Sequence, residues 1–435
     1  MEELSSVQHL LVSAVNSHSR YNRSLREVIT SSDLEWDEAV AAFRWHGIIP
    51  LLYHRLSKEN LTGLIPSEVV QELKQEYYKS LFSGIRVYDA LRNPLKALSE
   101  ADAEVIMLKG AALAETLYPE IALRPFGDID ILVREEDWPK IKRTLYKLDF
   151  KAHGTDIADL PPKLTKFDTV EHLHFLNQQG LNLELHFDLL QLGCAMRSTA
   201  DAWRTAHSVR IAGVETKILS PEYQLLHLCV HLNKHGYRRF IWFADIANLL
   251  RDKTFDWEKL RTIARTEGVL APVYYTLYYV NLFFGELVSN LVLESLKPGF
   301  IRRTVWERIW PAKKVEGFQG AREAGLVFNR EHLNRWLLPN LILTGRIIEK
   351  LHYLGRKAFP TSQFFSRKYF DGHKKISVLS YIYYYFRRLK NRFNQKRKSK
   401  LHKWFSFKIG RKLPKGVDKQ GLRAKGSEDE NRWLI

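Results

Sequence analysis

The clearest structural pattern in this 435-residue chain is the run Gly127-Asp128-Ile129-Asp130-Ile131-Leu132-Val133. Apolar and acidic residues alternate along it, which is typical of a β-strand because the side chains of a strand point alternately to its two faces. The alternation predicts Asp128 and Asp130 on one face and apolar residues on the other. Two carboxylates roughly 7 Å apart along a strand repel each other unless a cation lies between them, and Mg²⁺ prefers such oxygen ligands. We therefore expect a strand that holds metal-bound phosphates, with two solvated acids at a strand end as the alternative.

An apolar strand that runs into a glycine precedes this pattern. It reads Val105-Ile106-Met107-Leu108-Lys109-Gly110, and a helix-like stretch follows it to about Tyr118. A glycine at such a turn lets the backbone approach a ligand closely, and the free amides at the start of a helix attract an anion. Lys109 lies at this turn and Arg124 lies four residues before Asp128, so two cations flank a position suited to phosphate. Either could instead be an ordinary surface charge.

A second alternating segment is Gly180-Leu181-Asn182-Leu183-Glu184-Leu185-His186-Phe187-Asp188. Its polar side chains Glu184, His186 and Asp188 face one way and its large apolar side chains the other. A transfer site with two metal ions needs a third carboxylate, and we assign that role to Glu184 rather than to Asp188. An edge strand with one solvated face is the alternative.

Together these segments resemble the uncharacterised bacterial nucleotidyltransferases of the polymerase-β-like superfamily. The resemblance rests on Leu108-Lys109-Gly110, Arg124, the run 127–133 and Glu184-Leu185-His186, and it covers about residues 34–250. It implies an α+β fold in which a small mixed β-sheet core has helices on one face and is flanked by N-terminal and C-terminal helical regions.

The resemblance implies transfer of a nucleoside monophosphate from a nucleoside triphosphate, such as ATP, to an acceptor, with release of pyrophosphate. In such a site Asp128 and Asp130 hold the metal ion that bridges the triphosphate. One of them and Glu184 hold a second ion that activates the acceptor hydroxyl. The expected metal is Mg²⁺ or Mn²⁺, and these three acids form the expected catalytic and metal-binding set.

The resemblance also implies which residues bind the nucleotide and its phosphates. They are Lys109, Gly110, Arg124 and His186. Lys109 and Arg124 would neutralise negative charge on the phosphates as pyrophosphate leaves. His186 could equally orient a neighbouring carboxylate or be structural. Many family members carry a serine or a second glycine after the turn glycine, whereas this chain has Ala111. That departure keeps open a second function, a catalytically inactive nucleotide- or polyanion-binding protein of the same fold.

Three histidines, His227, His231 and His235, are spaced four residues apart. On one continuous helix they would share a face, and two of them could ligate zinc. Gly236 is expected to end that helix, and the resemblance implies instead that His231, His235 and Asp245 face the nucleotide or the acceptor.

Composition indicates a globular protein of two or three units, with 45% hydrophobic and 12% aromatic residues. The two cysteines, Cys194 and Cys229, make no disulfide framework and fit a reducing cytosol. The first residues, Met-Glu-Glu-Leu-Ser-Ser, lack the basic region and continuous apolar core of a secretion signal, so we expect no export. The longest apolar stretch, 269–284, is interrupted by Pro272 and is too short to cross a membrane, so we expect no transmembrane span and a cytoplasmic location.

The net charge of +18 is concentrated near the C-terminus. Residues 387–419 hold 14 lysines and arginines against one acid, Asp418, and so carry +13 of the total. Such a run is commonly a solvated extension. The aromatic residues within it, among them Trp404 and Phe405, favour docking on an anionic membrane surface or another polyanion.

Five regions are expected along the chain: an N-terminal helical region 1–100, a nucleotidyltransferase catalytic core 101–218, a helical lobe 219–300, a C-terminal aromatic-rich helical region 301–385 and a basic tail 386–435. Periodicity predicts helices over 34–56, with a break at Gly47 and Pro50, and over 67–98. Within the core it predicts strands near 104–108, 129–133, 171–177, 182–188 and 207–218, and helices over 111–118 and 135–148.

Overall fold

The computed structural model describes residues 5–15, 24–152, 172–190, 198–309 and 355. All of them belong to one of the two units into which the chain divides, the unit formed by Met1–His153 and Ala158–Lys357. The basic tail 386–435, most of the region 301–385 and Cys194 lie outside the described residues. The predictions for those parts therefore stay predictions, as do the expected domain boundaries.

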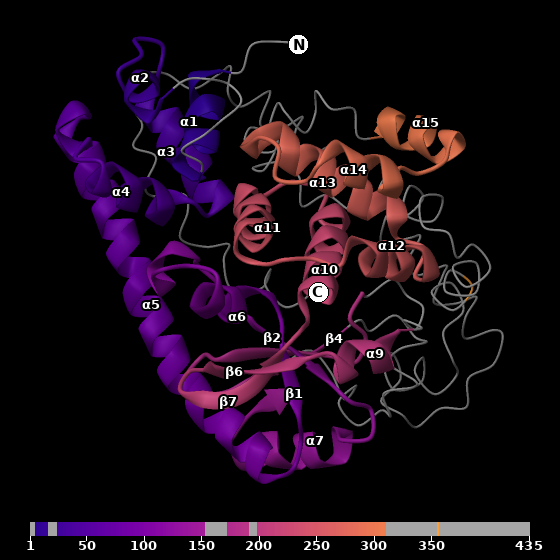
Figure 1. The fold of residues 1–435 in the computed structure, drawn as a ribbon. Helices are drawn as coiled ribbons and strands as arrows, with labels where there is room; N and C mark the ends of the chain where they lie inside the picture. The colour runs from indigo at the N-terminus through magenta and orange to yellow at the C-terminus, as the bar shows by residue number, and fades with distance from the viewer. Residues whose placement is uncertain (1–4, 16–23, 153–171, 191–197, 310–354, 356–435) are drawn as a thin grey trace, which may run out of the picture. The chain divides into compact units, whose positions relative to one another are not determined.

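Within the described residues, the strands form a seven-stranded mixed sheet in the order β3-β4-β5-β2-β1-β7-β6 (Figure 1). The central pair β1 and β2 is antiparallel, β2–β5 and β1–β7 are parallel, and the outer pairs are antiparallel. The expected mixed sheet of an α+β fold is thus confirmed. The strands are β1 (Val105–Met107), β2 (Ile129–Val133), β3 (Lys151–Ala152), β4 (His172–Leu176), β5 (Asn182–His186), β6 (His207–Ile211) and β7 (Val214–Ile218).

The expected strand 207–218 is a two-strand hairpin. Ala212 and Gly213 form its turn with φ angles of 54° and 78°. Two consecutive residues with positive φ are characteristic of the tight turns that match the twist of paired strands. Glycine adopts this conformation readily, and the turn reverses the chain so that Ile211 pairs with Val214.

Helices account for most of the remaining described residues. Gly47, with φ of 71°, ends one helix and Pro50 lies in the first turn of the next, which confirms the expected break. The helices are α1 (Ser6–Val15), α2 (Leu25–Ile29), α3 (Trp36–His46), α4 (Ile49–Lys58), η1 (Thr62–Leu64), α5 (Ser67–Glu100), α6 (Lys109–Thr116), η2 (Ile121–Leu123), α7 (Trp138–Lys147), α9 (Thr199–Arg204), α10 (Pro221–Lys234), α11 (Phe240–Asp252), α12 (Trp257–Thr266), α13 (Leu270–Phe284), α14 (Asn290–Leu296) and α15 (Phe300–Ile309).

One face of the sheet packs against α7. The Trp138 ring at the start of α7 lies 6.1 Å from the ring of Phe175 on β4 and 5.6 Å from that of Phe187 just after β5. Because neighbouring residues of a strand point to opposite faces, the residues next to Phe175 project from the other face. Figure 1 shows α7 on one side of the sheet and α10 on the other. The polar side of the sheet therefore faces α10.

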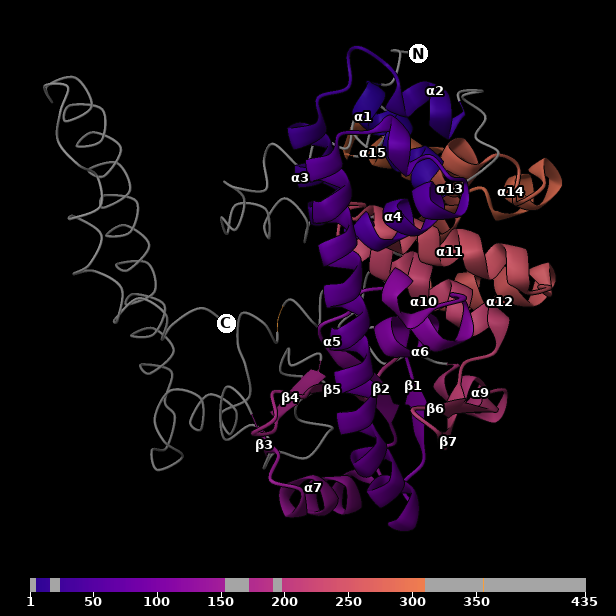
Figure 2. The same ribbon diagram turned by 90° about the vertical axis from the view of Figure 1, so that its left-hand side faces the viewer.

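The long helix α5 links the N-terminal helices to the sheet. It begins directly after Pro66, as expected, and continues to Glu100. Near its start, Leu73 belongs to the apolar cluster of the helices. Near its end, Arg92 Nε donates a hydrogen bond of 3.2 Å to the carbonyl of Ala212 in the β6–β7 turn. Figure 2 shows α5 running past the N-terminal helices and past the sheet.

Buried side chains of α1–α4 and of α10–α14 form one hydrophobic cluster. Phe43 of α3 and Phe243 of α11 are among its fully buried members. The expected N-terminal helical region and helical lobe thus share a core. Helix α13, the longest apolar stretch, is largely buried in it. No helix in the described part of the chain is long and apolar enough to cross a membrane.

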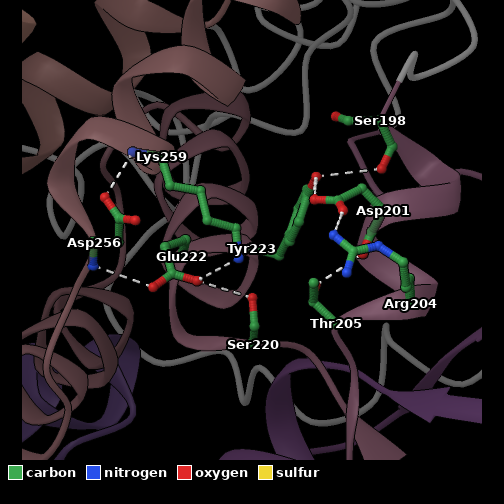
Figure 3. A network of polar contacts seen from close by, with 9 residues as sticks. All are labelled: Ser198, Asp201, Arg204, Thr205, Ser220, Glu222, Tyr223, Asp256 and Lys259. Carbon is green, nitrogen blue, oxygen red and sulfur yellow. Dashed lines mark hydrogen bonds and ion pairs between the residues drawn. The ribbon is translucent and has the colours of Figure 1, made fainter.

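A polar network fastens the first turn of α10 to α9 and α12 (Figure 3). The Glu222 carboxylate accepts hydrogen bonds of 3.2 Å from both the Asp256 backbone amide and Lys259 Nζ. The Tyr223 hydroxyl donates one of 2.8 Å to Asp201 Oδ2. These contacts position the helix that carries the histidine series.

Candidate active site

The strand register brings the expected acids together. Strands β2 and β5 are parallel neighbours, and Asp130 lies directly opposite Glu184. On the other side of β5, Glu184 lies opposite His174 of β4, and two residues along the same pair His186 lies opposite His172. Residues two apart on a strand share a face. All five side chains therefore project from one face of the sheet.

Asp130 is a buried carboxylate with two polar partners. Its Oδ1 lies 2.7 Å from Lys109 Nζ and 2.8 Å from His186 Nε2. Burial alone would raise the pKa of Asp130, but the charge of Lys109 and the hydrogen bond to His186 outweigh it and hold that pKa far below its ordinary value. Burial also lowers the pKa of His186, so its imidazole is neutral at pH 7 and Nε2–H donates to Asp130. Asp130 thus stays ionised.

Glu184 is held in the opposite state. Burial, followed by the negative charges of Asp130 and Asp128, raises the pKa of Glu184 to about 8, against which Lys109 acts only partly. The Asp128 side chain is also within hydrogen-bonding reach of Glu184. Three carboxylates therefore converge beside Lys109, and Glu184 is largely protonated at neutral pH.

This donor set fits a divalent cation. A cation among Asp128, Asp130 and Glu184 would relieve the repulsion that raises the pKa of Glu184. Ligand atoms of Asp130, Glu184 and His186 lie within 4.8 Å of one another, and so do those of a second group, His172, His174 and Glu184. Carboxylate oxygens suit Mg²⁺ or Mn²⁺.

The glycine turn packs tightly against the aspartate strand. Regular helical geometry begins at Ala111, because Gly110 has non-helical backbone angles. A Cβ atom at Gly110 would lie 3.1 Å from Phe126 Cβ and 3.5 Å from the carbonyl oxygen of Asp128. Only glycine leaves this space free. The turn therefore places Lys109 directly against the carboxylate of Asp130.

A sequence profile of the family described as "Uncharacterised nucleotidyltransferase" matches residues 32–285, more than half of the chain. The chain belongs to this family. The matched residues include the whole sheet and all the acids described above.

One solved structure shows a distant likeness to this chain. The crystal structure of an antigenic nucleotidyltransferase-like protein from Paracoccidioides brasiliensis is 14% identical, with a TM-score of 0.32, over 49% of this chain and 93% of that one. No curated protein sequence matches this chain. The assignment therefore rests on the family profile.

Arg124 lies in a buried ion pair with Asp245. Its Nε lies 2.9 Å from Asp245 Oδ1 and its terminal nitrogen 2.8 Å from Asp245 Oδ2, and it also donates to the Pro125 carbonyl. The Tyr118 hydroxyl donates to the same carboxylate at 2.7 Å. The pair joins the segment that enters β2 to α11. The guanidinium group of Arg124 is already paired with Asp245. The expected contact between Arg124 and phosphate stays a prediction.

Arg239, which has no distinctive signal in the sequence, lies close to the acids. Partial desolvation and the charges of Arg124 and Arg238 lower the pKa of Arg239, whereas nearby Asp128 raises it. Its guanidinium carbon lies 5.5 Å from the ring centre of Trp45. The sequence signal for Arg239 is weak: it is one of two consecutive arginines, Arg238 and Arg239, shortly after Gly236.

The histidines of α10 lie on the side of the helix that faces Lys109. Burial and the charge of Lys109 lower the pKa of His227 to about 3 and also depress that of His231. The His231 ring lies 4.5 Å from that of His235 and 4.9 Å from Trp242. Helix α10 ends at Lys234, as the glycine after it predicted. The two groups of described residues whose ligand atoms lie close enough to hold a metal ion do not include these histidines.

A pocket of about 230 Å³ borders the segment that enters β2. Arg124, Pro125 and Phe126 line one side of it, and residues of α3, α4 and α5, including Lys79 and Ser80, line the rest. Asp128, Asp130 and Glu184 do not line this pocket, although Glu76 of α5 does. It therefore adds apolar and polar surface next to the segment without being part of the acidic cluster.

Proposed function

We propose that this protein is a metal-dependent nucleotidyltransferase that moves a nucleoside monophosphate from a nucleoside triphosphate to an acceptor and releases pyrophosphate. One observation carries the proposal: Asp130 lies directly opposite Glu184 on parallel strands of a nucleotidyltransferase-family sheet, with Asp128 beside both. Paired and bridging carboxylates of this kind are what a site for phosphoryl transfer with two metal ions needs.

In this proposal Asp128, Asp130 and Glu184 hold the divalent cations. Bound Mg²⁺ or Mn²⁺ would orient the triphosphate and lower the pKa of the attacking hydroxyl. The carboxylates hold the cations in place, and the neutral His186 fixes the orientation of Asp130 through their 2.8 Å contact. Positioning and charge stabilisation are therefore the main contributions of this chain to catalysis.

The phosphate charge is met by cations of this chain. Lys109 Nζ has three donors and uses one on Asp130, so it can bind a phosphate oxygen at the same time. Arg239 supplies a second positive charge near Asp128. Both charges would stabilise the pyrophosphate as its bond to the nucleotide lengthens.

A nucleotide-binding protein without transferase activity is the second candidate. The observation that favours it is Ala111, the residue after the turn glycine, which is buried and offers no hydroxyl. The carbonyl oxygen of Ala111 already accepts a hydrogen bond of 2.6 Å from Tyr88. Such a protein would bind triphosphates at the same turn and release them unchanged.

The two candidates differ in label transfer. The purified full chain would be incubated with Mg²⁺ or Mn²⁺, each α-labelled triphosphate and a fractionated lysate as the source of acceptors. The proposal predicts label transfer that disappears in Asp128→Asn and in Asp130→Asn and persists in Asp89→Asn, a control on exposed α5 surface. Wild-type turnover in both site variants would overturn the proposal, and nucleotide binding without transfer would establish the second candidate.

A further inference from the structure

Two histidines and a glutamate form a cluster at the edge of the acidic site. His174 Nδ1 lies 3.3 Å from Glu184 Oε1, and His172 Nε2 lies 3.8 Å from Glu184 Oε2. The two imidazole rings are 4.6 Å apart between centres. The ligand atoms of all three residues lie within 4.8 Å of one another.

These separations are close to those of a coordination shell. Zinc–nitrogen and zinc–oxygen bonds of about 2.0–2.2 Å keep neighbouring ligand atoms roughly 3–3.5 Å apart. The His174–Glu184 and His172–Glu184 contacts of 3.3 and 3.8 Å need only small side-chain rotations to meet that range. Since strand backbones hold His174 opposite Glu184, the rotations leave the fold unchanged.

The cluster is supported from behind and accessible from the front. Leu173 and Phe175, which alternate with the histidines on β4, are buried, and the Phe175 ring packs on Trp138. About a third of each histidine side chain is exposed, at 28% for His172 and 30% for His174. An ion can therefore reach the cluster and complete its coordination with water.

The donor atoms determine the class of ion. Two imidazole nitrogens with one carboxylate suit Zn²⁺ and related first-row transition metals, whereas Mg²⁺ prefers a shell of oxygen atoms. The cluster thus prefers a different metal ion from the neighbouring set of Asp128, Asp130 and Glu184, although Glu184 belongs to both.

We propose that His172, His174 and Glu184 bind a transition-metal ion of the Zn²⁺ class. The site adjoins the proposed transferase centre through Glu184. Its occupancy does not depend on nucleotidyl transfer, and it can be measured with no nucleotide present.

Calorimetry with the metal alone tests the site. The full-length protein, freed of metal by a chelator, would be titrated with Zn²⁺ and in parallel with Mg²⁺. We expect the Zn²⁺ dissociation constant to rise at least about 100-fold in His174→Ala and in His172→Ala, because loss of even an outer partner of a metal ligand typically costs about 10–100-fold. Exposed His207 on β6 provides the control, and His207→Ala should bind as the wild type does.

Co²⁺ gives a second readout, because its visible absorption reports the ligand set. His174→Gln and His172→Gln keep side-chain volume in case the alanine variants unfold, and melting curves without metal would check their folding. Equal Zn²⁺ or Co²⁺ binding by wild type and folded histidine variants would overturn the site. Absence of Zn²⁺ binding in the wild type would also overturn it, and would show that the histidines serve only as polar neighbours of Glu184.

Asp128→Asn separates this site from the proposed function. The variant should lose nucleotidyl transfer and keep Zn²⁺ affinity, because Asp128 is not one of the three ligands. Loss of Zn²⁺ binding in Asp128→Asn, together with its retention in both histidine variants, would place the ion among the aspartates and refute the histidine site. Zn²⁺ binding by a wild-type protein that transfers no nucleotide would support the metal site while removing the transferase proposal.

Discussion

Lys109 and Asp130 form a nearly buried ion pair, with 2.7 Å between Nζ and Oδ1 and with 13% and 3% of their side chains exposed. The pair joins the turn after β1 to the start of β2. A carboxylate this deeply buried remains ionised only because a cation and a hydrogen-bond donor compensate for its lost hydration.

Lys109→Met should therefore destabilise the fold as well as the site. Asp130 would keep His186 as a partner but lose its countercharge, and breaking a buried pair typically costs about 3 kcal/mol or more. Urea unfolding measures the change in the free energy of unfolding. Lys96→Met, which removes the partner of Glu100 in an exposed pair, is the matched control and should leave stability nearly unchanged. Equal effects of the two substitutions would contradict a structural role for the buried pair.

Gly110→Ala should disturb the phosphate turn while Gly127→Ala should not. A Cβ at Gly110 would lie 3.1 Å from Phe126, whereas at Gly127 it would meet no atom within 4 Å. Overpacking of this kind costs about 1–3 kcal/mol, and the displaced turn should also weaken nucleotide binding. Unfolding curves and titration with a labelled triphosphate would be compared for the two variants. If both behave as the wild type does, the turn has more room than the structure indicates.

Arg239→Met should weaken triphosphate binding without changing stability. A hydrogen bond to a charged group contributes about 1.5–3 kcal/mol, so KM for the triphosphate should rise about 10- to 100-fold. The neighbouring variant Arg238→Met is the control, because Arg238 Nε donates instead to the carbonyl of His235. Steady-state kinetics measure KM, and an unchanged KM in Arg239→Met would exclude that residue from phosphate binding.

Acid should destabilise this protein through its buried histidines. Burial lowers the pKa of His227, His172 and His235 to about 3, below the ordinary value of 6.5. The unfolded chain therefore binds more protons between these pH values, and stability that is full above pH 6.5 falls as pH drops toward 3. His227→Gln should reduce this pH dependence, as measured by thermal melting at stepped pH. His54→Gln on α4 is the control, and an unchanged profile in His227→Gln would contradict the assignment.

Much of the acidic cluster follows from local pattern. Alternation along 127–133 and 180–188 predicted two strands with their acids on one face, and the structure confirms both strands. Their pairing as parallel neighbours, with Asp130 opposite Glu184, depends on how the chain crosses over between them. The alternation alone does not determine that register, although the family resemblance implied that the acids meet.

Contacts between distant segments were not predictable. Arg124 and Asp245 are separated by 121 residues in the sequence, and nothing near either residue indicates its partner. An aspartate within the apolar segment of α11 does indicate that some cation must compensate it. His172 and His174 had a local signal, since His-Leu-His on a strand places both imidazoles on one face. Their significance depends on Glu184, which belongs to the next strand.

The Arg124–Asp245 pair also bears on how substrates enter. It fastens the segment leading into β2 to α11 with several hydrogen bonds, and both side chains are largely buried. Any hinge motion that drew these two segments apart would strand two opposite charges in an apolar interior, at a cost of several kcal/mol. In the proposed transferase, the segment leading into β2 and α11 should therefore stay together while substrates bind.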